Sequence, residues 1–244
     1  MLRGLIARAC AQASLCAAGT RVLSAAEGAA PCSRRPPWQA ARKYSFPPLS
    51  QFRSWQEVSL RLLSSRIIWL QGPVDSALAT SVIGQLLLLE SESKEKPVSL
   101  YINSPGGEVD SGMAIYDTMQ FIDAPVQTTA IGSVSSIAAL ILCGGLPGER
   151  RALPNSRMMI HQPSGGAIGP ASDIAIHAKE MLRVRARLNE LFAEHTGQEL
   201  KYIEDLMERD HWMTAEEAKE LGLIDVVLRK EDQAAQPVDP TKRD

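Results

Sequence analysis

The sequence lacks any long apolar run and any strong net charge. No stretch of about 18 consecutive apolar residues occurs in the chain, so no transmembrane helix is predicted. The formal net charge of the 244 residues is −2, which gives no indication of a nucleic acid partner. The composition, 45% hydrophobic and 22% charged, is typical of one globular domain with tails.

Acidic residues are almost missing from residues 1–44, which hold seven basic residues and one acid, Glu27. A segment rich in arginine, alanine and serine and poor in acids is typical of an organelle transit peptide. Arg42-Lys43-Tyr44-Ser45 resembles a mitochondrial processing site, so the mature chain would begin at Ser45. We therefore expect the mitochondrial matrix, with the plastid stroma as the second destination. A disordered basic tail is the alternative interpretation.

Cysteine is scarce, and three of the four cysteines lie in this N-terminal segment. After its removal only Cys143 would remain, in an apolar helical run where a buried core thiol is expected. A single cysteine excludes both a disulfide framework and a cysteine-based metal site.

Between the tails, strand-like apolar runs alternate with helical patterns of about ten or more residues. We expect an extended arm over residues 45–56, a domain over 57–228 and a disordered tail over 229–244. The alternation predicts an α/β domain with a largely parallel sheet. The expected helices cover residues 57–65, 76–92, 111–122, 138–143, 170–195, 199–208 and 214–221, and the expected strands cover 67–70, 98–103, 126–131, 157–161 and 223–228. The glycine-rich segment 162–169 is expected to be a flexible loop.

Three residues supply the parts of an activated nucleophile: the hydroxyl of Ser136, the imidazole of His161 and the carboxylate of Asp210. Ser136 is expected where a strand meets a helix, and free N–H groups at a helix N-terminus suit a developing oxyanion. The backbone N–H of Ile137 is one candidate donor. The N–H of Gly107 is the other, because a residue without Cβ allows close approach to the backbone.

Each of these residues also has a structural interpretation. Ser136 could be an ordinary helix N-cap, and Ser133 and Ser135 are equally good nucleophiles on sequence grounds alone. His161 could be a structural histidine, and Asp210 could pair with Arg209 or cap a turn. The other histidines of the domain are His177, His195 and His211.

Several motifs resemble those of a known family. They are Tyr-Ile-Asn-Ser-Pro-Gly-Gly at residues 101–107, Ala-Ile-Tyr-Asp-Thr-Met-Gln at 114–120, Leu-Pro-Asn-Ser-Arg at 153–157, Met-Ile-His-Gln-Pro-Ser-Gly-Gly at 159–166, His-Thr-Gly-Gln at 195–198 and Met-Glu-Arg-Asp at 207–210. The chain resembles the proteolytic subunits of the Clp protease, of mitochondrial type, within the ClpP/crotonase superfamily. The resemblance runs from about residue 57 to about residue 228.

The resemblance implies a ClpP/crotonase-like fold with repeated β-β-α units and a protruding handle over about residues 162–195. It assigns Ser136 as nucleophile, His161 as base and Asp210 as orienting acid, with oxyanion donors at Gly107 and Ile137. The implied protein is an ATP-dependent serine endopeptidase that cuts unfolded polypeptides to short peptides in protein quality control.

The implied assembly is a homo-oligomer of two stacked seven-membered rings. An AAA+ unfoldase such as ClpX would use ATP to feed it. No cofactor or metal is implied for the subunit itself, and neither is a membrane partner.

The sequence departs from the family around the nucleophile and at the surface where an unfoldase docks. Ser135-Ser136-Ile137 replaces the usual Ala-Ser-Met, and Gly132-Ser133-Val134 replaces Gly-Gln-Ala. The arm at residues 45–56 lacks the usual pattern. Of the docking positions, Tyr101, Phe121 and Leu228 match, whereas Thr129 and Arg151 are polar.

These departures support a second hypothesis, a weakly active structural subunit of a mixed barrel. A crotonase-like acyl-CoA enzyme is a third, and the complete serine, histidine and aspartate set argues against it.

Overall fold

The computed structural model describes residues 54–230, and residues 1–53 and 231–244 lie outside the described part. The transit peptide, most of the expected arm and most of the expected tail therefore remain predictions. Two of their edges differ from expectation. Helix α1 already begins at Trp55, within the expected arm, because Ser54 caps it by accepting a hydrogen bond from the N–H of Glu57. Arg229, placed in the expected tail, forms an ion pair with Glu216.

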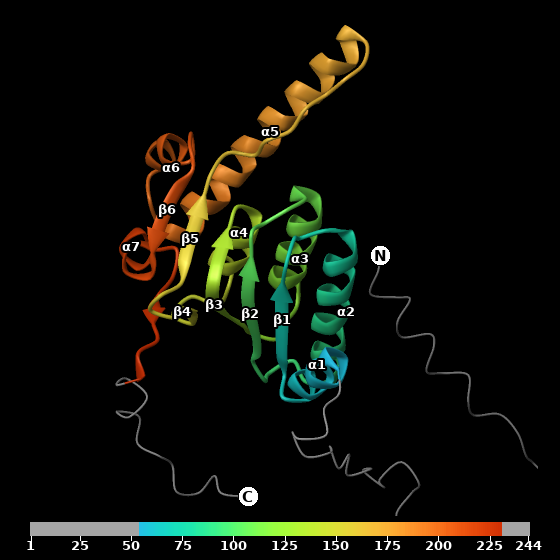
Figure 1. Cartoon of the computed structure of the whole chain (residues 1–244), viewed down its shortest axis with the longest axis vertical. Helices are drawn as coiled ribbons and strands as arrows, with labels where there is room; N and C mark the ends of the chain where they lie inside the picture. The colour runs from blue at the N-terminus through green and yellow to red at the C-terminus, as the bar shows by residue number, and fades with distance from the viewer. Residues whose placement is uncertain (1–53, 231–244) are drawn as a thin grey trace, which may run out of the picture. The chain divides into compact units, whose positions relative to one another are not determined.

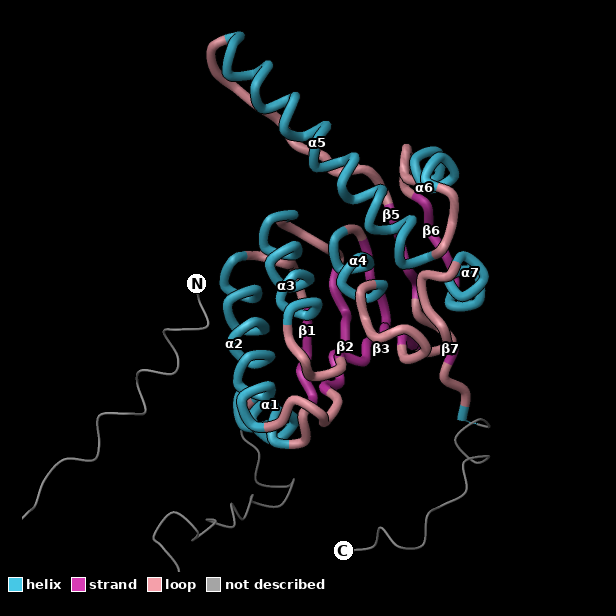
Figure 2. The backbone as a smooth tube through the Cα atoms, turned by 180° about the vertical axis from the view of Figure 1, so that it is seen from behind, coloured by secondary structure: helices cyan, strands magenta, loops and turns pink. Residues whose placement is uncertain are grey.

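The first half of the domain alternates strictly between helices and strands (Figure 1). Its elements are α1 (Trp55–Ser64), β1 (Ile67–Gln71), α2 (Ser76–Glu92), β2 (Val98–Ser104), α3 (Val109–Phe121), β3 (Val126–Ser135) and α4 (Ile137–Cys143). Capping matches the sequence: the Asp75 carboxylate accepts from the N–H of Leu78 at 2.8 Å and begins α2. Figure 2 shows α2, α3 and α4 on one face of the strands.

The second half contains β4 (Arg150–Ala152), β5 (Arg157–Ile160), α5 (Ala171–Thr196), α6 (Leu200–Leu206), β6 (His211–Thr214), α7 (Ala215–Leu221) and β7 (Val226–Val227). The succession β4, β5, α5 is a β-β-α unit. Helix α5 ends at Gly197, which adopts φ +72°, a conformation that glycine accepts at little cost. The expected capping box of α7 is present, with Thr214 and Glu217 bonded reciprocally.

The sheet is parallel except for its last strand. Its order is β1-β2-β3-β4-β7, and the long strand β3 pairs with β4 through residues 128–130 and with β5 through residues 133–135. Strand β6 then pairs antiparallel with β5. The predicted α/β fold with a mostly parallel sheet is therefore confirmed.

The sequence predictions differ from the structure mainly in the strands. Strands β4 and β6 were not predicted, β3 runs four residues further than expected, and β7 keeps only two residues of the strand expected at 223–228. The missed strands are short, and their patterns alternate too briefly to be recognised. Pro170 was predicted at the first helical position of α5 but stands at its N-cap.

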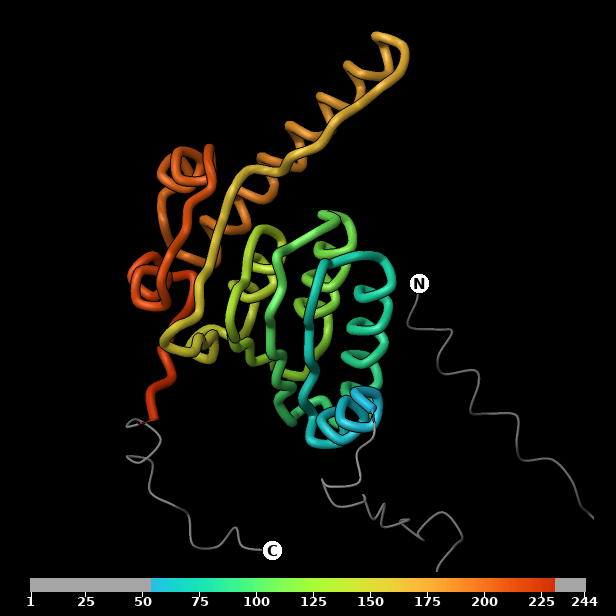
Figure 3. The backbone as a smooth tube through the Cα atoms, in the orientation of Figure 1, coloured from blue at the N-terminus to red at the C-terminus, as the bar shows by residue number. Residues whose placement is uncertain are grey.

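Helix α5 extends well beyond the sheet, and the segment 162–169 runs along its projecting half (Figure 3). The C-terminal part of α5 is anchored in the core, because Leu188, Leu191 and Phe192 are buried. Most of its N-terminal half is exposed, including Ile174, Ile176 and Leu182. The helix thus combines a buried base with a protruding arm that carries apolar side chains.

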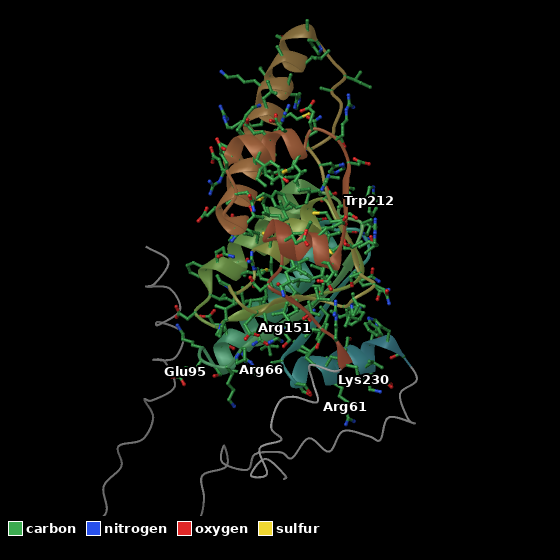
Figure 4. The ribbon with its side chains drawn as sticks, turned by 90° about the vertical axis from the view of Figure 1, so that its left-hand side faces the viewer. Arg61, Arg66, Glu95, Arg151, Trp212 and Lys230 are labelled. Atoms are coloured by element: carbon green, nitrogen blue, oxygen red, sulfur yellow. The ribbon has the colours of Figure 1, made fainter. Side chains whose placement is uncertain are left out.

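Arg66 lies just before β1, at the end of the domain away from the projecting half of α5 (Figure 4). Its backbone has φ +60°, and its guanidinium donates to the carbonyls of Leu89, Ser93, Lys96 and Pro97. These bonds add partners to carbonyls at and beyond the C-terminus of α2, where helices leave carbonyls unsatisfied. The carbonyl of Leu89 also accepts from the N–H of Ser93.

Candidate active site

Strand β3, which leads to Ser136, contains a β-bulge. Between the pairs Ile102↔Ala130 and Ser104↔Val134 the register shifts, so that β3 carries two more residues than β2. Gly132 lies in this bulge with φ +77°, and the Asn103 side-chain oxygen accepts a 3.3 Å hydrogen bond from the N–H of Ser133. Bulges of this kind re-aim side chains next to active sites.

Ser136 stands between the end of β3 and the start of α4, in a conformation unusual for a residue with a side chain. Its φ is +57° and its ψ is −129°, a region that costs on the order of 1–3 kcal/mol outside glycine. The serine makes no capping hydrogen bond with its side chain. Its own N–H donates to the carbonyl of Met159 at 2.8 Å. The hydroxyl is therefore not an ordinary N-cap, and it points to another partner.

That partner is His161, which directly follows β5. Its Nε2 lies 3.0 Å from Oγ of Ser136, and its Nδ1 lies 2.9 Å from Oδ1 of Asp210. The parallel pairing of β5 with β3 places Met159 opposite Ser135, so the residues after both strands meet. The structure thus brings all three predicted side chains together in the order carboxylate, imidazole, hydroxyl.

Asp210 reaches His161 because β6 pairs with β5, with His211 opposite Ile160. Gln162 fastens the loop that carries the acid. Its N–H donates to the carbonyl of Met207 at 2.7 Å, and its side-chain amide donates to the carbonyl of Glu208 at 2.8 Å. Gln162 is thus a positioning residue next to His161, whereas the sequence predicted it only as part of the flexible loop and handle.

The alternative serines and histidines do not join the contact between Ser136 and His161. Ser135 is buried, with 3% of its surface exposed, and within residues 54–230 neither its hydroxyl nor that of Ser133 bonds a histidine. His195 bonds the hydroxyl of Tyr116 at 2.6 Å, and burial lowers the pKa of His195. His177 lines the larger pocket along α5, which contains neither Ser136 nor His161.

The two predicted oxyanion donors belong to different segments, the start of α4 and the loop after β2. Ile137 is the first residue of α4, so its N–H has no partner within the helix. The chain at Gly106 is packed on Ser136, since a Cβ on Gly106 would lie 2.7 Å from Cβ of Ser136. The N–H of Gly107 belongs to the peptide that follows Gly106.

The fold itself also requires glycine at 107. A Cβ there would lie 2.2 Å from the carbonyl oxygen of Val74, so a neighbouring chain segment restricts this position. The loop is held on its other side by Ser104, whose hydroxyl accepts from the N–H of Gly106 at 3.1 Å. Asn103, Ser104 and Gly106 share one motif, and its density of turn residues was the available signal for their role.

A small pocket opens beside the serine. It is lined by Val109, Ser136, Ile137, His161, Pro163, Leu188, Phe192 and Met207. A larger pocket of about 550 Å³ adjoins it between the segment 163–167 and α5, and the two share Val109 and Pro163. Within residues 54–230, no cluster of three or more histidine, cysteine or acidic side chains has the geometry of a metal site.

The family comparison agrees with this geometry. The model of the family described as Clp protease matches residues 50–231. The chain belongs to the Clp protease family. Clp proteases are peptidases, and family members generally form oligomeric rings with unfoldase partners. The matched range of this Clp protease contains Ser136, His161, Asp210, Gly107 and Ile137. No helix within residues 54–230 is long and apolar enough to cross a membrane.

Proposed function

We propose that this protein is a serine endopeptidase, the proteolytic subunit of an ATP-dependent Clp protease. The observation that supports it is the continuous hydrogen-bonded chain from Asp210 through His161 to Ser136, with distances of 2.9 and 3.0 Å. A serine hydroxyl is weakly nucleophilic until a base within hydrogen-bonding distance accepts its proton. Because the chain belongs to a peptidase family, we infer that the bond attacked by Ser136 is a peptide bond.

The reaction follows from the order of the three groups. Oγ of Ser136 attacks the scissile carbonyl while Nε2 of His161 takes its proton, and the Asp210 carboxylate stabilises the resulting imidazolium. The N–H groups of Ile137 and Gly107 donate to the oxyanion of the tetrahedral intermediate. His161 then gives the proton to the leaving amine, and the C–N bond breaks. Water, activated by the same imidazole, releases the peptide from Ser136.

The positive φ of Ser136 supports this assignment independently. Strained backbone persists where the surrounding structure enforces it, and such residues cluster at active sites. Here the 2.8 Å bond from the N–H of Ser136 to the carbonyl of Met159 helps to hold it. The hydroxyl is thereby directed at the imidazole without rearrangement.

Assembly into two stacked heptameric rings is the second part of the proposal. It is supported by the projecting half of α5, whose Ile176 and Leu182 are 66% and 63% exposed. Apolar side chains on a protruding arm are typical of a surface that another protein covers. In this assembly the handle made by residues 162–195 joins the two rings.

The partner in the proposal is an AAA+ unfoldase such as ClpX, which uses ATP while the subunit itself needs no cofactor. Of the expected docking positions, Phe121 is 83% exposed, and Tyr101 stacks on Trp69 with ring centroids 5.9 Å apart. Arg151 forms an ion pair with Glu149, so charge lies where an apolar surface was expected. The transit peptide supports action in the mitochondrial matrix, in protein quality control, with the plastid stroma as the alternative destination.

The test combines native mass with degradation by the purified full chain. We expect a particle of about fourteen subunits that degrades an unfolded protein when an unfoldase and ATP are added, and we expect Ser136→Ala to abolish degradation. The charged Arg151 at an expected docking position favours one competitor, the structural subunit of a mixed barrel; Thr129 is buried, with 4% of its surface exposed. A chain that forms no double ring alone, and is active only with a second subunit type, would support that competitor.

A further inference from the structure

The small pocket at Ser136 is narrow enough to select substrates. Its volume is about 10 Å³, close to the ~10–15 Å³ that a single water molecule requires. A methyl group is only slightly larger than a water molecule. The pocket therefore has room for the side chain of alanine, and not for those of leucine, methionine or phenylalanine.

One wall of the pocket cannot move away. Ile137 is 3% exposed and is seated against the backbone of Gly112 in α3, where an added Cβ would lie 2.1 Å from its Cγ1. A β-branched side chain has few rotamers available, so Ile137 has no alternative position on that side. The family's usual methionine at 137 is unbranched and more adaptable.

A second wall belongs to the anchored end of α5 and to the loop before Asp210. Leu188, Phe192 and Met207 supply it, with exposed fractions of 6%, 3% and 1%. Side chains in a close-packed interior yield only at a cost, since extra methylene groups force neighbours from their preferred positions. These two walls thus restrict the pocket on the sides away from Val109 and Pro163, which it shares with the larger pocket.

The pocket also lies where a substrate side chain must go. When a carbonyl carbon sits on Oγ of Ser136 and its oxygen on the N–H of Ile137, the side chain of the residue that supplies this carbonyl is adjacent. Of the pockets described in this structure, this one contains both Ser136 and His161. Their polar groups are engaged with each other at 3.0 Å, and the other walls are apolar.

We propose that this pocket receives the residue on the amino side of the cleaved bond and restricts it to alanine-sized side chains. Alanine is preferred over serine, because a serine hydroxyl would be buried without a partner there. The inference rests on the proposed function, since it requires Ser136 to be the nucleophile. It adds a substrate class, peptides and proteins cut after alanine, that the triad alone does not define.

The test uses peptidyl diphenyl phosphonates that differ only in the side chain next to phosphorus: alanine, leucine or methionine. Attack by Oγ of Ser136 forms an O–P bond and expels phenoxide, so labelling of the full chain is followed by mass. A fluorophosphonate without such a side chain reports on the nucleophile alone. We expect the alanine probe to label Ser136 at least about 10-fold faster than the other two.

Two variants on one helix separate pocket size from stability. Leu188→Ala enlarges the pocket, whereas Leu191→Ala makes the same change at a residue that is buried to 2% exposure but does not line it. We expect Leu188→Ala to bring the leucine and methionine probes close to the alanine rate, and Leu191→Ala to keep the original preference. Phe192→Leu is a second, milder enlargement in case Leu188→Ala does not fold.

Equal rates with all three probes would overturn the inference and leave the proposed function intact. The same holds if the fluorophosphonate labels Ser136 while no peptidyl probe does, or if the preference survives in both enlarged variants. Failure of the fluorophosphonate itself would overturn the proposed function and the inference with it.

Discussion

Oγ of Ser136 lies 3.0 Å from Nε2 of His161, although the two residues are 25 positions apart in the chain. Two parallel strands create this contact, because β3 ends at Ser135 beside the end of β5 at Ile160. The 2.9 Å contact from His161 to Asp210 depends in the same way on the antiparallel pairing of β5 with β6. The three groups are therefore positioned by the sheet, which is a rigid support for catalysis.

Replacement of Asp210 should affect the orientation of His161 without affecting the stability of the protein. Asp210→Asn removes the charge that stabilises the imidazolium and favours the wrong tautomer of His161, so we expect kcat to fall on the order of 10⁴-fold. Asp210 is 63% exposed at its side chain, so the melting temperature should hardly change. Peptide turnover and thermal unfolding, measured on the same preparation, check both statements. Turnover close to that of the parent protein would exclude Asp210 from the triad.

The bulge in β3 gives a second prediction. Asn103→Leu keeps the size of the side chain but removes the oxygen that accepts from the N–H of Ser133. The bulge would then lose its support three residues before Ser136, and a small displacement of a nucleophile costs on the order of 10²-fold in rate. We expect kcat to fall by about that factor with KM little changed.

Asn103→Asp retains an acceptor oxygen and is the matched control, so it should recover most of the lost rate. A parallel loss in both variants would show that Asn103 acts through general stability. The comparison therefore tests the hydrogen bond to Ser133 and not the presence of asparagine as such.

The sequence predicted the α/β alternation and the principal helices, and particular signals explain why these predictions are confirmed. Asp75 and Thr214 are side-chain caps with a recognisable pattern, and the β2 strand alternates clearly between more and less buried positions. The meeting of Ser136 with His161 could not be derived from spacing, because it depends on which strands pair. Motif resemblance supplied that assignment.

Other features depend on tertiary contacts and left no local signal. The conformation of Ser136 and the bulge at Gly132 arise from packing of Gly106 and Asn103 against them. Strand β6 is four residues long and exists only as a partner of β5. The clash that excludes a Cβ at Gly107 comes from Val74, which is distant in sequence.

A buried ion pair gives a prediction for stability. The Arg150 guanidinium, with 9% of its side chain exposed, binds the Asp225 carboxylate through two bonds of 2.6 and 2.8 Å. Burial raises the pKa of Asp225, but the hydrogen bonds from Arg150 outweigh it and hold the pKa below its ordinary value. Asp225→Asn would leave the guanidinium without its counter-ion, and we expect a loss of about 3 kcal/mol in the free energy of unfolding.

Asp205→Asn is the control for that measurement. Asp205 pairs with Lys201 on the surface, where both side chains are more than half exposed, so the change should be much smaller than that in Asp225→Asn. Urea unfolding of the two variants gives the comparison. Similar losses in both would mean that the burial of Arg150 is unimportant.

His195 predicts a dependence of stability on pH. Burial lowers its pKa below the ordinary value of 6.5, so in acid the unfolded chain takes up a proton before the folded chain does. Above the unfolded pKa, His195 is uncharged in both states and its ionisation does not change the free energy of unfolding. As the pH falls from 6.5 toward the folded pKa, the free energy of unfolding decreases.

His195→Gln removes this group, so the variant should lose less unfolding free energy than the parent between about pH 7.5 and about pH 5.5. Urea titrations at both pH values measure the difference. Identical pH dependence in the two proteins would contradict the burial of a neutral imidazole at this position.

The identity of the nucleophile is tested most directly by labelling the full chain with a fluorophosphonate and mapping the modified residue by mass. The triad geometry predicts one modified serine, Ser136, and no labelling in Ser136→Ala, while Ser133→Ala and Ser135→Ala remain reactive. Labelling that persists in Ser136→Ala and disappears in Ser135→Ala would contradict the assignment of Ser136.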